Sequence, residues 1–228
     1  MPTLRLASYN VHRGIGRDRR CEPQRILEVL REIDADVFAL QEVEAHDDGG
    51  DMLAWLAEQT GYHAIAGTTL KRHDGHYGNG MLTRCRVEEK SLCDLSWRGR
   101  EPRGAIAADV NCEGHVVRVV ATHLGLRPAE RREQVERLLQ LFSWKEGDRA
   151  VLMGDLNEWF LWGRPLRRLH RYFDATRAVA TFPSRFPVLA LDRLWTHPGS
   201  ILKSLAAHDS ERARIASDHL PLVATLEL

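Results

Sequence analysis

Short apolar runs with strand periodicity follow one another along this chain, and several of them are joined without a helix between them. The first run, 4–11, alternates apolar and polar residues as a half-buried strand does. Strands that succeed one another in this way fit an α+β layered sandwich better than a strict strand–helix alternation. Further strands are expected at 36–43, 62–67, 80–84, 104–111, 115–123, 149–154, 191–197, 201–207 and 221–227.

A few amphipathic helices are interleaved with these strands. Asp51 can cap the start of one, and Gly61 follows its expected last residue as a stop signal. Because 228 residues with 43% hydrophobic content can bury a sizeable core, we expect one domain spanning 1–228. Helices are expected from Pro23, over 51–60, over 128–144 and around 163–171.

The charge balance and the cysteines narrow the class of protein. Lys and Arg number 32, as do Asp and Glu, so the formal net charge is zero and bulk charge would not hold the chain on nucleic acid or on a membrane. No apolar run approaches the ~20 residues that cross a bilayer. We also expect no signal peptide, because a strand pattern starts at Leu4 with no cationic and apolar region before it. The cysteines show no C-x-x-C spacing, so we expect a cytoplasmic protein with four reduced thiols: Cys21, Cys85, Cys93 and Cys112.

Polar residues gather where the apolar runs end. Each has an ordinary explanation, since a Glu after a strand is usually solvated and an Asn after G-D is often a turn former. Their recurrence at strand ends is more informative, because loops cluster there and sites are built there. The period of two would also place Asn10 with His12, and Asp155 with Asn157, on one face. The residues are Asn10, His12, Gln41, Glu42, His123, Asp155, Asn157, Asp192, Asp218 and His219.

These runs carry motifs that resemble the endonuclease/exonuclease/phosphatase superfamily, which includes DNase I-like and exonuclease III-like nucleases. The motifs are SYNVHRG, LQEVE, ATHLGL, GDLNEW, LDRLW and SDHLPL, in the family's order and spanning 8–222. HLGLR, GDLNEW and TFPSRFPVLALDRLW resemble most closely a small bacterial subgroup whose substrates are mostly unassigned. The resemblance implies a four-layer α/β/β/α sandwich with the site at one end between two sheets.

The resemblance also implies roles for the matching residues. Glu42 would be the principal ligand of a divalent cation, supported by Asn10 and Asp218, with Mg²⁺ expected and Mn²⁺ as a possible substitute. His219 and Asp192 resemble the family's His–Asp pair, in which the carboxylate fixes the imidazole tautomer. Asp155 would orient or deprotonate the attacking water. Asn157 and His123 would donate hydrogen bonds to the phosphate oxygens.

The implied activity is metal-dependent hydrolysis of a phosphodiester or phosphomonoester by in-line attack of water. One alternative is a DNA or RNA nuclease of the same superfamily. An alternative of another class is a metal- or phosphate-binding module that has lost the chemistry, which the presence of the metal and histidine positions disfavours. No protein partner is expected.

Substrate contacts are less well defined. Arg103 and Asn79 are expected to bind substrate together with His12, which departs from the Asp or Gln that many nucleases of the superfamily carry there. His12 could contact phosphate or a second metal, or make a structural hydrogen bond. Five arginines over 164–177 indicate either a basic surface beside the site or a solvated helix face.

The nature of the substrate depends on two further features. The aromatic run at 159–162 could stack on bases or sit at a lipid interface, but we expect it to pack against the core. Because 228 residues leave only short loops, we favour a small or exposed phosphodiester, such as a lipid headgroup or a single-stranded end, over duplex DNA. A lipid substrate would require only transient membrane association.

Overall fold

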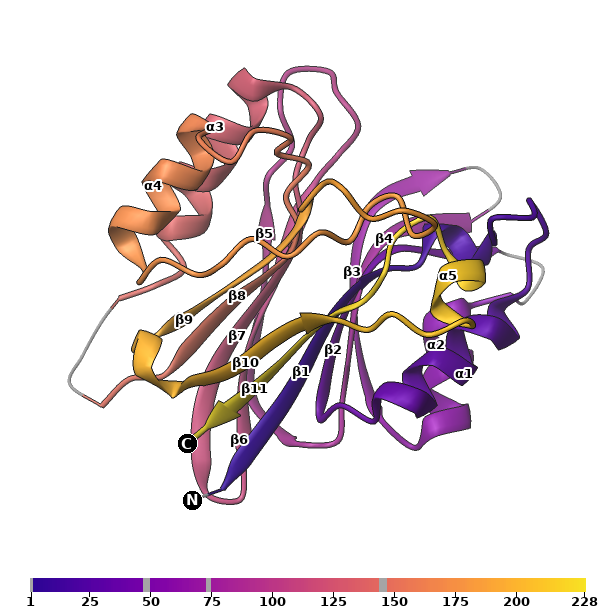
Figure 1. Cartoon of the computed structure of the whole chain (residues 1–228), viewed down its shortest axis with the longest axis horizontal. Coiled ribbons are helices and arrows are strands. Elements are labelled where there is room, and N and C mark those ends of the chain that lie inside the picture. Colours follow the sequence, from indigo (N-terminus) through magenta and orange to yellow (C-terminus); the bar gives the residue numbers. More distant parts are fainter. Residues whose placement is uncertain (1, 47–49, 73–74, 144–146) are drawn as a thin grey trace.

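Two β-sheets lie face to face, and helices cover the outer face of each (Figure 1). This is a computed structural model, which describes residues 2–46, 50–72, 75–143 and 147–228. The predicted α+β four-layer sandwich is confirmed. In chain order the elements are β1 Thr3–Asn10, η1 His12–Gly14, α1 Pro23–Ile33, β2 Val37–His46, α2 Met52–Thr60, β3 His63–Arg72, β4 Gly75–Thr83, β5 Arg86–Asp94, β6 Gly104–Cys112, β7 His115–His123, α3 Pro128–Leu139, β8 Ala150–Asp155, α4 Arg164–Tyr172, β9 Asp192–His197, η2 Gly199–Ile201, β10 Leu202–Ala207, α5 Ala213–Ala216 and β11 Leu222–Glu227.

The first sheet has six strands in the order β10-β11-β1-β2-β4-β3, and the second has five in the order β5-β6-β7-β8-β9. The alternation of each strand sends one set of side chains between the sheets and the other under the helices. In β1, for example, Leu4 and Leu6 join the core between the sheets, whereas Ala7 and Tyr9 join the core beneath α1, α2 and α5. A third core lies between the second sheet and α3 with α4.

The helix signals in the sequence act as predicted. Pro23 is the first residue of α1, whose buried face includes Ile26, Leu30 and Ile33. The Asp51 side chain accepts a hydrogen bond from the Ala54 amide at 3.0 Å, and Gly61 ends α2 in the left-handed conformation. None of the helices in the described ranges is long and apolar enough to cross a bilayer.

Some elements differ from the prediction. The helix expected over 128–144 ends at Leu139, and residue 144 lies outside the described residues. Strand β5 was not predicted, because it is an edge strand with most of its side chains exposed and has no apolar period. The short elements η1 and α5 were also not predicted.

The expectation of four reduced cysteines is wrong. Cys85, just after β4, and Cys112, the last residue of β6, form a disulfide within the core between the sheets. The 27-residue separation gives no local sequence signal, because the fold alone brings the two strand ends together. Cys21 and Cys93 carry free thiols. Because disulfides persist mainly in oxidising compartments, the bond removes the reason for expecting a cytoplasmic protein.

Candidate active site

The strand registers bring most of the predicted polar residues to one edge of the two sheets. Asn10 pairs with Gln41 in the first sheet, and Asp155 pairs with both His123 and Asp192 in the second. Strands β1, β7 and β8 end at this edge and the antiparallel β9 begins there, while β2 crosses it at the irregularity between Leu40 and Val43. Five strands therefore contribute side chains to it. The site therefore lies where strand ends of both sheets meet.

His219 and Asp192 form a buried hydrogen-bonded pair. The Nδ1 atom of His219 lies 2.8 Å from Asp192 Oδ2, which also accepts a hydrogen bond from the Thr181 hydroxyl. Burial disfavours the charged imidazole, but the charges of Asp192, Asp155 and Asp218 outweigh it and raise the pKa of His219 to about 10. The imidazole is thus protonated at neutral pH, and its Nε2 lies 3.8 Å from Asp155 Oδ2.

Asn10 links the two sheets across the site. Its amide nitrogen donates to Asp155 Oδ2 at 3.1 Å and to Glu42 Oε1 at 3.2 Å. Glu42 lies at an irregularity of β2 with a positive φ of 60°, which turns its side chain out of the regular alternation. Burial raises the pKa of Glu42, and the nearby charges of Asp218 and Asp155 raise it further. A surplus of carboxylate charge therefore surrounds this amide.

His123 is held as a neutral imidazole. Its Nδ1 lies 3.0 Å from Arg103 Nη1, and because arginine can only donate, Nδ1 must accept and the proton must sit on Nε2. Burial, followed by the charge of Arg103, lowers the pKa of His123 to about 3. The acceptor that faces this Nε2 proton is Asp155 Oδ2, 3.5 Å away, while the side-chain Nδ2 of Asn157 lies 3.0 Å from Nε2 and donates to the Leu124 carbonyl. His123, Asn157 and Asp155 thus form one cluster.

The prediction that a period of two places these residues on one face is wrong for both pairs. Strand β1 ends at Asn10, and His12 lies beyond it with a φ of 45° and donates its backbone amide to Asn10 Oδ1. Strand β8 likewise ends at Asp155, and Asn157 has a φ of 50° while its amide donates to Asp155 Oδ1. The two residues of each pair still lie close together, but in a turn. In each turn the side-chain oxygen of the first residue, Asn10 or Asp155, accepts a hydrogen bond from the backbone amide two residues later.

The remaining predicted residues lie around this cluster. The imidazole of His12 donates through Nδ1 to the Ile15 carbonyl at 3.1 Å, which supports the structural role, and also lies 3.8 Å from Asp218 Oδ1. The Asn79 amide donates to the Gly104 carbonyl at 2.9 Å, next to Arg103. Asp218 is partly exposed, with 40% of its side chain accessible, whereas Asp155 and Asp192 are buried.

Sequence reasoning assigned no role to three side chains that hold this arrangement together. The Thr181 hydroxyl binds Asp192 at 2.5 Å, and Thr181 begins the TFP segment of the sequence. The Ser217 hydroxyl donates to the Asn10 carbonyl at 2.7 Å, which ties the loop of His219 to the end of β1. Phe182 packs against the His219 ring, with centroids 4.8 Å apart.

The donor set fits a hard divalent cation. Asp155, Asp192 and His219 have ligand atoms within 4.8 Å of one another, but hydrogen bonds already engage the Asp192 and Asp155 oxygens that face the imidazole. Glu42 and Asp218 lie on the more accessible side and offer carboxylate oxygens, which Mg²⁺ prefers. A cation beside Glu42 would also favour its ionised form, which burial disfavours most and the charges of Asp218 and Asp155 disfavour further, raising its pKa.

The aromatic run at 159–162 does not pack against the core, contrary to expectation. Trp159, Phe160, Leu161 and Trp162 are between 55% and 69% exposed. The reason lies in the preceding residue: Glu158 points inward, where its carboxylate meets the buried guanidinium of Arg131 at 3.1 Å. Of the predicted basic stretch, Arg168 pairs with Glu136 of α3 on the outer helical layer, as a solvated helix face would.

Comparison with known proteins agrees with the fold and with the motifs. The chain is 28% identical to the uncharacterized protein YbhP of Escherichia coli K12 over 99% of this chain and 97% of that protein. An endonuclease/exonuclease/phosphatase from Beutenbergia cavernae superposes with a TM-score of 0.82 at 24% identity, covering 99% of this chain and 72% of that one.

A Bacteroides thetaiotaomicron protein described as a mannosyl-6-phosphatase superposes with a TM-score of 0.73 at 20% identity, covering 99% of this chain and all of that one. The sequence profile of the Endonuclease/Exonuclease/phosphatase family matches residues 7–219, nearly the whole chain. The chain therefore belongs to the Endonuclease/Exonuclease/phosphatase family, a family of phosphoester hydrolases.

Proposed function

We propose that the protein is a divalent-metal-dependent hydrolase of phosphate esters, with phosphodiesters as its main substrates. The observation that carries this proposal is the Asp192–His219 pair, buried beside Asp155 and connected through Asn10 to Glu42. A protonated imidazole, carboxylates and neutral hydrogen-bond donors at one site are the groups that phosphoryl transfer to water requires.

The geometry suggests how these residues divide the work. Asp192 fixes His219 through Nδ1, so the proton on Nε2 is free to donate to an oxygen of the phosphate as charge develops there. Asp155 Oδ1 accepts a hydrogen bond from the backbone amide of Asn157, which fixes the carboxylate. The fixed carboxylate would orient an attacking water and accept its proton. The Nε2–H of His123, which faces Asp155, and the side-chain amide of Asn157 would donate to the phosphate oxygens when substrate is bound.

Glu42 and Asp218, with Asn10 in support, would hold Mg²⁺, and Mn²⁺ is expected to substitute. When bound, the ion supplies Lewis-acid stabilisation of the phosphoryl and leaving oxygens. Asn10 holds carboxylate oxygens of Glu42 and Asp155 close together, because its amide nitrogen donates to both carboxylates, which come from opposite sheets. Arg103 acts indirectly, since its guanidinium keeps the His123 proton on Nε2.

The test is a hydrolysis panel with Mg²⁺ and with Mn²⁺. Its substrates are bis-p-nitrophenyl phosphate, p-nitrophenyl phosphate, single- and double-stranded DNA, RNA and phospholipid vesicles. We expect His219→Ala to lower kcat/KM on any cleaved substrate by ~10²–10⁴-fold while the protein stays folded. His63→Ala is the matched control, because His63 is exposed and pairs with Thr83, at the opposite end of the sheet.

A loss below tenfold in His219→Ala, or an equal loss in both variants, would refute the assignment. Cleavage of nucleic acid alone would instead make the protein a nuclease of the same family. Mg²⁺-dependent thermal stabilisation that Glu42→Gln removes, without turnover of any substrate, would indicate a metal-binding module that lacks the chemistry.

A further inference from the structure

Exposed apolar side chains gather in three segments around the active site, 126–127, 159–164 and 185–188, which we call the rim segments. Seven of the ten large hydrophobic residues that are exposed in the described parts of the chain lie in them. Such a concentration on one face marks an interaction site, whereas scattered exposed hydrophobics do not. The seven are Leu126, Trp159, Phe160, Leu161, Trp162, Phe186 and Val188.

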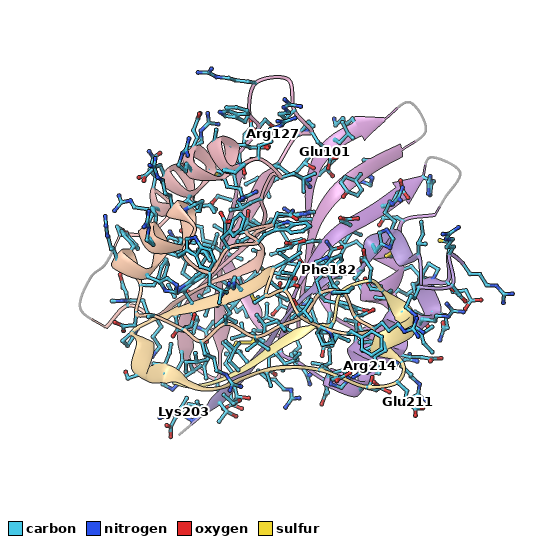
Figure 2. The ribbon with its side chains drawn as sticks, turned by 45° about the horizontal axis from the view of Figure 1, so that its top comes forward. Glu101, Arg127, Phe182, Lys203, Glu211 and Arg214 are labelled. Carbon is cyan, nitrogen blue, oxygen red and sulfur yellow. A yellow bond between two sulfur atoms is a disulfide. The ribbon has the colours of Figure 1, made fainter. Side chains whose placement is uncertain are left out.

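Each rim segment is connected to a residue of the site. The first follows His123 and the second follows Asn157 by two residues. The third is attached to the His219 loop, because the Ser184 amide donates to the Asp218 carbonyl at 2.7 Å. In Figure 2, Phe182 lies between Arg127 of the first rim segment and Arg214, whose guanidinium donates to the carbonyl of Arg185 in the third segment at 2.8 Å. The rim segments thus flank the site on both sides.

The charges of the rim segments all have one sign. Each segment contains one exposed arginine, Arg127, Arg164 or Arg185, and none contains an acidic residue. The Arg185 guanidinium lies 5.2 Å from the centre of the Phe186 ring, so basic and apolar groups share one surface. In a chain with equal numbers of acidic and basic residues, this local excess complements a negatively charged surface.

Buried bonds fix two of the rim segments in place. Arg131 of α3 donates to the carbonyls of Gly125 and Leu126 and also to the Glu158 carboxylate, and both charged side chains are about 3% exposed. The other Glu158 oxygen accepts from the Phe160 amide at 3.2 Å. A rigid backbone holds the aromatic side chains outward, which lowers the entropy lost when they insert into a partner.

We propose that the rim segments bind the protein to an anionic lipid bilayer, which presents headgroup phosphodiesters to the active site. Aromatic side chains with adjacent arginines are typical of proteins that lie in the membrane interface. Single-stranded nucleic acid fits less well, because Leu126, Leu161 and Val188 have no ring to stack on a base but gain from contact with acyl chains. This proposal rests on the hydrolase function proposed above.

The test compares wild type with Trp159→Ser/Phe160→Ser/Trp162→Ser in co-sedimentation with vesicles of phosphatidylglycerol and phosphatidylcholine in equal parts. We expect the triple variant to bind at least ~10-fold more weakly, because each side chain contributes apolar area. Leu92→Ser/Val116→Ser is the matched control, since both residues are exposed but lie on β5 and β7 outside the rim segments, and it should bind like wild type.

Two readouts separate the possible failures. Arg127→Gln/Arg164→Gln/Arg185→Gln should weaken binding by about fivefold per arginine on the mixed vesicles, and much less on pure phosphatidylcholine. Hydrolysis of bis-p-nitrophenyl phosphate should be unchanged in both triple variants. If wild type does not hydrolyse this soluble diester, the hydrolase function fails, whereas vesicle binding still tests the surface.

The membrane proposal is overturned by any of three results. One is equal vesicle binding by wild type and the aromatic triple variant. Another is no vesicle binding by wild type, with single-stranded DNA binding that the variant loses. The third is wild-type self-association that the variant abolishes, which would make the rim segments a contact between two copies of the chain.

Discussion

Replacing Arg131 by Met should cost more stability than any change at an exposed arginine, because it leaves Glu158 buried without its partner. The Glu158 Oε2 atom accepts from Arg131 Nε at 3.2 Å and from Nη2 at 3.1 Å, and the same guanidinium satisfies the carbonyls of Gly125 and Leu126. Breaking a buried pair on one side costs about 3–5 kcal/mol.

The assay is urea unfolding followed by tryptophan fluorescence or circular dichroism, with thermal melts in parallel. For a chain of this size, 3–5 kcal/mol corresponds to a Tm lower by ~6–20 °C. Arg132→Met is the matched control, because Arg132 is the next residue of the same helix and is exposed. Its effect should stay within about 0.5 kcal/mol.

A double-mutant cycle completes the test. Arg131→Met/Glu158→Leu removes both charges, so it should be less destabilised than Arg131→Met alone, although two carbonyls still lack their donor. A loss under 1 kcal/mol in Arg131→Met would refute the view that this pair is buried and closed to water. A double variant that loses the sum of the single effects would refute the coupling.

Two further predictions concern the site strand and the surface charges. In urea unfolding, Gly154→Ala should lower the free energy of unfolding by more than ~3 kcal/mol, because its Cβ would lie 1.9 Å from the Thr122 carbonyl oxygen. The control Gly114→Ala has open space around it and should cost only the ~1 kcal/mol of a left-handed backbone. Equal losses in the two variants would contradict this. Burial opposes ionisation of Glu32, but hydrogen bonds from Ser210, His208 and Arg212 outweigh burial and lower the pKa of Glu32 to about 2. The ~1 kcal/mol that the ionised carboxylate contributes to stability is therefore present above pH 4.5 and is lost as the pH falls toward 2. The stability gap between wild type and Glu32→Gln should narrow over that range, and a gap that is constant with pH would exclude this role.

Much of the fold follows from local rules that the sequence states directly. Asp51 and Gly61 delimit α2 as their capping chemistry predicts, and alternating residues of β1 divide between two cores. Most of the polar residues also meet as expected, because β1, β7 and β8 end and β9 begins at the same edge of the sheets. The motifs alone show which chemical groups meet there.

The detailed geometry of the site could not be predicted, because it depends on where each strand stops. A period of two says which face a residue takes while the strand continues, but Asn10 and Asp155 end their strands. Glu42 departs from the alternation through a β-bulge, and His12 and Asn157 adopt positive φ angles. The Cys85–Cys112 bond joins residues whose proximity exists only in the folded sandwich.

The segment after Asn157 reverses the usual arrangement of side chains, and the sequence gives only a faint sign of it. An acid next to four apolar residues would ordinarily face water while the aromatics pack inward. Here Glu158 is buried because Arg131 of α3 pairs with it. Gly163 packs so closely against Glu158 that a Cβ at Gly163 would lie 2.4 Å from the Glu158 carboxylate carbon. Glu158 takes the inward position and also holds the Phe160 amide, and the four side chains that follow it lie outside. A fold that buries a charge pair and exposes two tryptophans beside its candidate active site loses hydrophobic stabilisation, and the proposed binding to a lipid surface would recover it.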